Sequence, residues 1–137
     1  MPQKIQEIVN RAGRIGTLST ADREGRPNVA YFGSARLLED GGFVVGLAQN
    51  RTLANLAENP HAVFFCVEPG PVGFDTPGCR LYLKVKEIQE KGPVLNAIKK
   101  AIAEHAGEAA ANMMFAAVIF DVVKLRPVMD MEHAAWL

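Results

Sequence analysis

The chain has 137 residues, of which 49% are hydrophobic, and its 15 basic and 15 acidic residues give a formal net charge of zero. This length suits one domain with a sizeable core, so residues 1–137 are expected to form a single domain. Balanced charge excludes the broad basic footprint of a nucleic-acid-binding protein. With no signal-peptide pattern and no apolar run near the roughly 20 residues of a membrane span, a cytoplasmic protein without membrane partners is expected.

The first part of the chain predicts a helix followed by strands. Apolar residues recur at helical spacing over residues 3–12, and Gly13 can end that helix in a left-handed cap. Strand patterns follow over residues 14–20 and 28–38 with turn residues between them, which predicts a hairpin. A third strand over residues 43–48 then continues an antiparallel meander.

A short helix is predicted between this third strand and a fourth over residues 61–67. Asn50 or Thr52 can cap it, and Pro60 limits its length. At its start, unpaired backbone N–H groups and the helix dipole suit an anion such as phosphate, and Arg51 adds a fixed charge. A plain crossover helix with a solvated arginine fits the same pattern about equally well.

The remaining chain predicts a loop, two strands and a helix. Residues 69–79 contain three prolines and three glycines, which predicts a long exposed loop. Residues 80–90 alternate as a strand with one solvated side, and residues 94–106 form an amphipathic helix. Residues 115–126 are so apolar that both faces of the strand must be covered. Six strands in this order favour a small barrel with helices at its rim, closed by pairing of two subunits.

Catalytic and metal-binding patterns are missing from the sequence. Ser19 and Ser34 are the only serines and neither lies in a nucleophile elbow, while no two of the three histidines are spaced as a metal-binding pair. Cys66, in a strand pattern, and Cys79, in the predicted loop, are interpreted as free thiols. Catalytic residues are therefore left unassigned and no metal is expected. A phosphate-sized positive site without proton-transfer groups suits a phosphorylated cofactor that itself carries the reaction.

The segment order over residues 10–125 resembles the FMN-binding split-barrel proteins related to pyridoxamine 5′-phosphate oxidase. The most specific part is the segment 50–60, in which a small polar residue, an arginine and a hydroxyl residue lead to a closing Asn59-Pro60. The resemblance implies a mainly β fold, a six-stranded antiparallel split barrel with α-helices at the rim. It also implies FMN bound at the interface of a homodimer.

The same resemblance implies which residues surround FMN, with its ring against the second and third strands. They are Val29, Ala30, Tyr31, Phe32 and Ser34 beside the ring, Leu47, Ala48 and Gln49 near the ribityl chain, Asn50, Arg51, Thr52 and Asn55 at the phosphate, and Trp136, hypothesised to reach the other subunit's flavin. Adjacent strand residues point to opposite faces, so only one of Tyr31 and Phe32 can line the pocket.

The function expected from this resemblance is an oxidoreductase that passes electrons or hydride between a reduced nucleotide or protein donor and a small acceptor through FMN. Two departures from the oxidases argue against vitamin B6 oxidation. Thr52 stands where a second basic residue is usual, and Arg126 is followed by Pro127 in place of a C-terminal Arg-x-His. The alternatives are a non-enzymatic protein that binds, stores or senses flavin or haem, and a dimeric scaffold without a cofactor.

Overall fold

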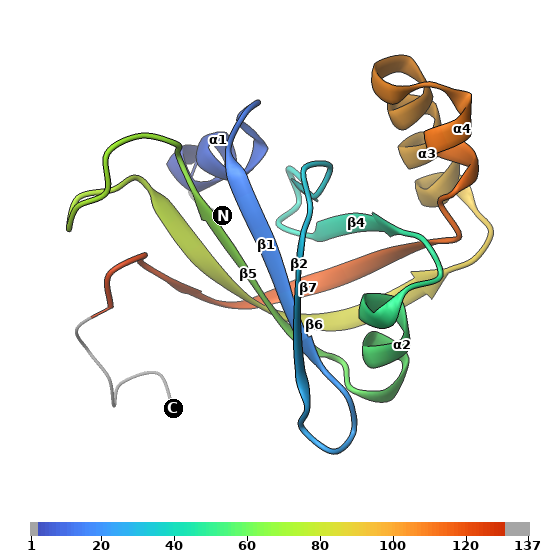
Figure 1. Ribbon diagram of the computed structural model, residues 1–137, viewed down its shortest axis with the longest axis horizontal. Helices are drawn as coiled ribbons and strands as arrows, with labels where there is room; N and C mark the ends of the chain where they lie inside the picture. The colour runs from blue at the N-terminus through green and yellow to red at the C-terminus, as the bar shows by residue number, and fades with distance from the viewer. Residues whose placement is uncertain (1–2, 131–137) are drawn as a thin grey trace.

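The computed structural model describes residues 3–130. The helices are α1 (Gln3–Asn10), α2 (Arg51–Glu58), α3 (Pro93–Ala106) and α4 (Glu108–Asn112). The strands are β1 (Ile15–Ala21), β2 (Pro27–Tyr31), β3 (Arg36–Leu37), β4 (Phe43–Leu47), β5 (His61–Val67), β6 (Gly78–Gln89) and β7 (Ala116–Arg126). They form one antiparallel sheet in the order β2-β1-β5-β6-β7-β4-β3 (Figure 1).

Aromatic contacts in the core show that this sheet curls into a half-barrel. Phe43 of β4 and Phe64 of β5 have ring centroids 4.8 Å apart, although β6 and β7 separate these strands in the sheet. Phe120 of β7 joins them, with its centroid 6.0 Å from that of Phe43. Such distances require the sheet to bend until its strands face one another across a shared interior. The mainly β split-barrel fold predicted from the sequence is therefore confirmed.

Alternating side chains separate the inner face of the sheet from its outer face. Leu18, Phe64 and Leu81 lie on neighbouring strands and are fully buried. Along each strand, the residues before and after these three point to the opposite face and are exposed or half-buried. Burial therefore alternates along β1, β5 and the first half of β6. One face of the sheet thus encloses the core and the other remains open.

The helices cover the ends and one side of the half-barrel. α1 places Ile8 and Val9 in the core. α2 connects β4 to β5 and packs against β1 and β2, while α3 lies against β4 and β7. At Gly46 of β4 an added Cβ would lie 2.6 Å from Cγ2 of Ile98, so only glycine allows α3 to approach this closely.

The long strand predicted over residues 28–38 is wrong, because the chain leaves the sheet after Tyr31. The guanidinium of Arg14 donates to the carbonyl oxygens of Phe32 at 3.0 Å and Ala35 at 2.7 Å, which draws this segment inward. Pairing resumes only in β3, so the sheet has seven strands within residues 3–130 where six were expected. The predicted meander is confirmed at its two turns, where β1 pairs with β2 and β3 pairs with β4. It is wrong as one continuous run of neighbouring strands, because β2 and β3 lie at opposite edges of the sheet and β4 also pairs with β7.

Two predictions for the second half also change. Cys79, assigned to a loop, lies in β6, where it is 1% exposed. Both faces of β7 were predicted to be buried. This holds for its first residues, Ala116, Ala117 and Val118, which are fully buried, but it is wrong for the second half, where Val123 is 59% exposed. The β7 strand crosses from α3 to the open side of the sheet, so its two ends have different surroundings.

Candidate functional site

The N-terminus of α2 is capped by a side chain. Asn50 has extended backbone geometry, and its side-chain Oδ1 accepts a hydrogen bond from the backbone N–H of Leu53 at 3.0 Å. Its carbonyl oxygen accepts from the N–H of Ala54 at 3.1 Å. Asn50 is therefore the N-cap, one of the two alternatives left open by the sequence.

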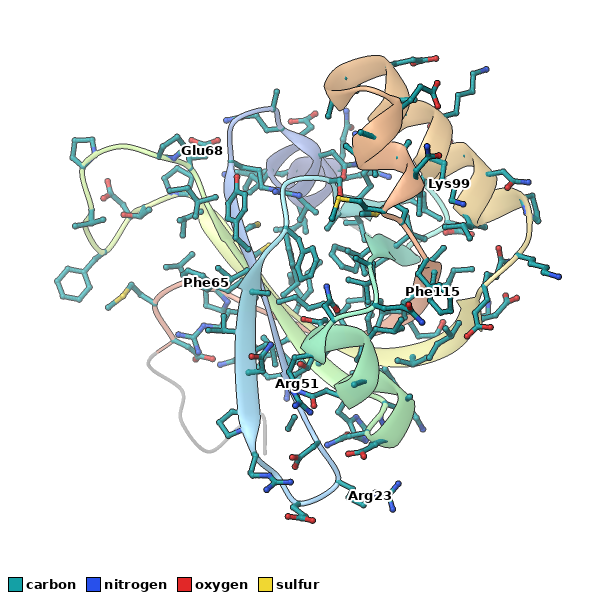
Figure 2. All side chains as sticks on the ribbon, turned by 45° about the vertical axis from the view of Figure 1, so that its right-hand side comes forward. Arg23, Arg51, Phe65, Glu68, Lys99 and Phe115 are labelled. Carbon is teal, nitrogen blue, oxygen red and sulfur yellow. The ribbon has the colours of Figure 1, made fainter. Side chains whose placement is uncertain are left out.

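Arg51 begins the helix as an exposed cation (Figure 2). Among residues 3–130 its guanidinium has no hydrogen-bond acceptor or carboxylate within reach. The backbone N–H of Arg51 also has no intrahelical acceptor, because the first N–H groups of any α-helix lack one. The charge and the positive helix end together form a site that can bind an anion.

Two other predicted phosphate-side residues lie in the interior. Thr52 is 2% and Asn55 is 1% exposed. The Nδ2 of Asn55 donates to Oγ1 of Thr20 on β1 at 3.1 Å, which fixes α2 to the sheet. In this arrangement Thr52 and Asn55 face the interior, whereas Asn50 and Arg51 are exposed. Arg51 is the charged member of the set that faces solvent.

The predicted ring-side residues divide between the two faces of β2. Val29 and Tyr31 are 62% and 65% exposed, while Ala30 is half-buried. Phe32 packs against the core, and its N–H donates to the carbonyl oxygen of Gly16 at 2.9 Å. The two aromatic residues thus point to opposite faces, Phe32 to the core and Tyr31 to the exposed outer face of the sheet.

The other predicted residues have mixed surroundings. Leu47 is fully buried in the core, and its carbonyl oxygen accepts from the N–H of Phe115 at 2.8 Å. Ala48 is half-buried and Gln49 exposed at the end of β4. Ser34 is exposed in the bend before β3, where it lines an apolar groove of about 380 Å³ with α3. Trp136 lies outside the described residues.

The outer face of the sheet carries apolar residues on β2, β5 and β6, a feature that no sequence motif predicted. The register aligns Tyr31 with Thr17 and Phe65, and Val29 with Ser19, Val63 and Tyr82. A shallow groove of about 350 Å³ runs over this face between β1, β5 and β6. The alternation of Val63, Phe65 and Val67 in β5 was the available sequence signal, since it places a second apolar row opposite the core.

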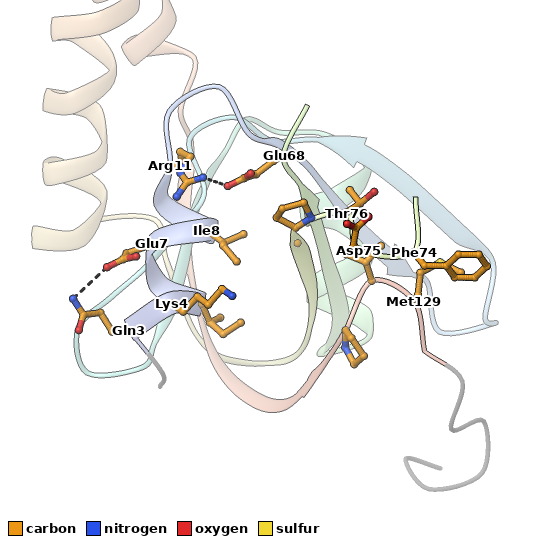
Figure 3. A pocket seen from close by; sticks show the side chains of 15 residues that line it. Gln3, Lys4, Glu7, Ile8, Arg11, Glu68, Phe74, Asp75, Thr76 and Met129 are labelled. Atoms are coloured by element: carbon orange, nitrogen blue, oxygen red, sulfur yellow. Dashed lines mark hydrogen bonds and ion pairs between the residues drawn. The ribbon is translucent and has the colours of Figure 1, made fainter. Parts of the chain in front are cut away.

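A larger groove, of about 910 Å³, lies between α1, residues 74–78 and residues 127–129 (Figure 3). Arg11 and Glu68 form an ion pair at its edge. None of its lining residues belongs to α2 or β2, so it is separate from the predicted site.

The hairpin of β1 and β2 is closed by a charged turn. The carboxylate of Asp22 accepts from Nε of Arg26 at 2.7 Å, from the N–H of Arg26 at 3.0 Å and from the N–H of Glu24 at 2.9 Å. The hydrogen bond from the Arg26 side chain, followed by those from the backbone, lowers the pKa of Asp22.

Negative findings apply to residues 3–130. In this part of the chain no three acidic, histidine or cysteine side chains are grouped to hold a metal ion. No helix within it is long and apolar enough to cross a membrane.

Comparisons with known proteins place this geometry in context. The family model described as pyridoxamine 5′-phosphate oxidase matches residues 1–129. No curated protein matches the chain. Similar solved structures include an FMN-binding protein from Syntrophomonas wolfei subsp. wolfei, with a TM-score of 0.79 and 23% identity over 93% of this chain and 85% of that one.

Two further structures share the fold. HupZ from Group A Streptococcus has a TM-score of 0.75 and 23% identity over 91% of each chain. HutZ, the haem storage protein from Vibrio cholerae, has a TM-score of 0.64 and 20% identity over 92% of this chain and 89% of that one.

Proposed function

The chain belongs to the pyridoxamine 5′-phosphate oxidase family, and on this premise we propose that it is an FMN-binding homodimer that acts as an oxidoreductase. The observation that carries the proposal is Arg51, an exposed cation without a partner among residues 3–130, at the N-terminus of α2. The family match and the neighbouring FMN-binding structure support a flavin as the ligand.

The phosphate of FMN would bind at the start of α2. A guanidinium can donate two parallel hydrogen bonds to phosphate oxygens, and the helix end contributes its N–H groups and dipole. Asn50 supports this arrangement indirectly, because its side chain caps the helix and leaves the N–H of Arg51 free. Thr20 and Asn55 hold the helix against β1 and so keep the site in place.

The ring would lie along β2, a strand that contacts α2 and whose outer face offers the exposed apolar and aromatic side chains of Val29 and Tyr31. An aromatic side chain can place a face or an edge against a flavin. Phe32 supports the strand from the core side. When bound, FMN supplies the electron or hydride transfer, while the protein orients it and controls access.

A second copy of the chain would cover the outer face of the sheet. On this face the exposed Val29 and Tyr31 and the half-buried Val63, Phe65 and Tyr82 lie on either side of Thr17 and Ser19 of β1. Large exposed apolar side chains gathered on one face are typical of interfaces. Ile15 and Val123, 43% and 59% exposed, extend it. A ring lying on β2 would then be enclosed between the two subunits and shielded from water.

The direct test is binding of FMN to the purified chain, with Arg51→Glu as the variant. Losing a charge-assisted hydrogen bond of about 1.5–3 kcal/mol predicts affinity at least about tenfold weaker, because 1.4 kcal/mol is a factor of ten. Lys100→Glu, an exposed charge on α3, is the matched control. Arg23 is less suitable, since its Nε lies 3.8 Å from Glu58 of α2. Equal affinities for both variants would contradict the proposed phosphate site.

A second candidate, haem binding, is favoured by His61. This exposed imidazole lines the outer groove together with Val63 and Tyr82, and imidazole is a common axial ligand of haem iron. The similar fold of the haem storage protein adds support. Absorption spectra after separate addition of FMN and haemin distinguish the two. Multiple turnover of a reduced nicotinamide by the FMN-loaded protein distinguishes an oxidoreductase from a flavin store.

A further inference from the structure

Two thiols face each other inside the half-barrel, outside the proposed cofactor site. Cys66 of β5 and Cys79 of β6 are direct partners in the antiparallel register, and they are 0% and 1% exposed. Their Sγ atoms lie 3.7 Å apart. They are also the only two cysteines of the sequence. Directly opposed residues project to the same face of a sheet and have Cα atoms about 4.5–5.5 Å apart, within the range that a disulfide spans.

A buried cation lies next to this pair. Arg14 is 4% exposed and donates to the carbonyl oxygens of Val9, Phe32 and Ala35 at 2.7, 3.0 and 2.7 Å. No carboxylate pairs with it in the described part of the chain. Its guanidinium carbon lies 5.1 Å from the centroid of the Phe64 ring.

Gly16 makes room for this arrangement. It is the partner of Cys66 on β1, on the side opposite Cys79. A Cβ at Gly16 would lie 2.5 Å from Cζ of Phe64 and 2.9 Å from Nη1 of Arg14. Gly16, Cys66 and Cys79 are therefore aligned across β1, β5 and β6, and the guanidinium of Arg14 lies next to Gly16.

The two thiols are electrostatically unequal. The hydrogen bond with Cys79 and, to a smaller extent, the charge of Arg14 lower the pKa of Cys66 against the opposing effect of burial. The same hydrogen bond and burial raise the pKa of Cys79. Cys66 is thus the better nucleophile, because the thiolate is the reactive form.

We propose that Cys66 and Cys79 are a redox-active pair that a hydroperoxide converts to a reversible cross-strand disulfide. The Cys66 thiolate attacks one peroxide oxygen and the O–O bond breaks, giving a sulfenic acid and hydroxide, which takes up the thiol proton as water. Sγ of Cys79 then attacks Sγ of Cys66 and expels hydroxide, which leaves as water with the second thiol proton. Two thiols and one hydrogen peroxide yield one disulfide and two waters, and an added dithiol reverses the step.

The groove of Figure 3 comes within one residue of the pair, because Gly78, the neighbour of Cys79, lines it together with Ile8 of α1. Hydrogen peroxide is close to water in size, so it suits a buried pair better than a bulky disulfide. The new bond would join β5 and β6 at the root of the loop of residues 68–77, where Glu68 N–H already donates to the Pro77 carbonyl at 2.9 Å.

The test uses the full-length wild-type protein, stripped of FMN and kept in the dark so that no flavin generates peroxide. Reduced protein is treated with hydrogen peroxide, quenched with catalase, unfolded and alkylated before mass spectrometry. We expect loss of two hydrogens, no alkylation, a cross-linked peptide containing both cysteines, and recovery of both thiols with dithiothreitol. Alkylation of both cysteines, a sulfinic acid at Cys66 with Cys79 still alkylated, or a disulfide between chains would overturn the proposal.

Two variants test the assigned roles. Cys79→Ala should leave Cys66 as a sulfenic acid that a dimedone-type reagent traps. Arg14→Gln should slow disulfide formation by about threefold for each unit by which the Cys66 pKa rises, since thiolate loss outweighs the gain in nucleophilicity. Lys100→Gln should not change the rate. The wild-type measurement decides the proposal even where a variant does not fold, and its failure leaves FMN binding unaffected.

Discussion

Arg14 combines two functions that a sequence pattern does not reveal. Its guanidinium satisfies three backbone carbonyl oxygens from two segments, Val9 at the end of α1 and Phe32 and Ala35 in the bend before β3. Burial lowers the pKa of Arg14. The residue therefore ends the second strand and also supplies the charge beside Cys66. A buried polar group persists only where its hydrogen bonds are made, and these three carbonyls meet that requirement.

Asp22 predicts a pH dependence of stability at the same scale. Its pKa is lowered in the folded state, so its contribution is present above the unfolded value of about 3.9 and is lost as the pH falls through the folded pKa. We expect Asp22→Asn to be less stable than wild type at pH 7, with the difference shrinking below about pH 4. Urea unfolding between neutral and acidic pH measures this.

The control is Asp40→Asn, in an exposed turn where the carboxylate accepts only the N–H of Gly42, at 2.9 Å, within the described residues. Because no arginine side chain pairs with Asp40 there, its replacement tests loss of a turn hydrogen bond without loss of the ion pair. If the stability difference for Asp22→Asn stayed constant with pH, the Arg26 interaction would not be its cause.

At the scale of elements, α3 and β4 depend on one small residue. The missing side chain of Gly46 lets Ile98 approach, and Met114 Sδ would lie 3.2 Å from an added Cβ. We expect Gly46→Ala to lower the free energy of unfolding by about 1–3 kcal/mol, because an extra methyl group in a packed contact displaces its neighbours. Thermal and urea unfolding provide the measurement.

Gly73→Ala is the matched control for this substitution. Gly73 lies in the exposed loop, and an added Cβ there would meet only Oδ1 of Asp75, at 3.2 Å, a side-chain atom that can move. A stability for Gly46→Ala within about 0.5 kcal/mol of wild type would mean that α3 shifts without cost.

In α2, the residues that pack against the protein are different from the residue proposed to bind the ligand. Thr52, Asn55 and Leu56 face the protein and are at most 3% exposed, while Arg51 faces solvent at the first position. The helix is therefore held by residues other than the one proposed to bind the ligand. Substitution of Arg51 can change affinity without removing the packing that positions α2.

At the scale of the whole molecule, the outer face of the sheet predicts association. We expect the wild-type chain to sediment as a dimer and Val29→Glu to weaken the dimer by at least about 100-fold, since a carboxylate left unpaired in an apolar interface costs several kcal/mol. Val72→Glu is the control, because Val72 is 92% exposed in the loop away from this face. Sedimentation of wild type as a monomer at all concentrations would contradict the prediction.

The sequence by itself determined the local elements and the exposed arginine. Helical periodicity, the Asn50 cap and Pro60 place α2 at Arg51–Glu58 within the predicted segment, and strand alternation places β1, β5 and most of β6. Such features depend on neighbours a few residues away, which a sequence pattern records directly. The position of Arg51 at the helix start follows from the same local rules.

Only the tertiary structure decided the order of strands and the groups it brings together. Pairing of β4 with β7 joins residues more than sixty positions apart, and closure of such long connections depends on how the whole core packs, which no local pattern encodes. The break after Tyr31 depends on Arg14, and the Cys66–Cys79 pair depends on the register of β5 with β6. The apolar outer face likewise exists only because the register aligns alternate residues of neighbouring strands.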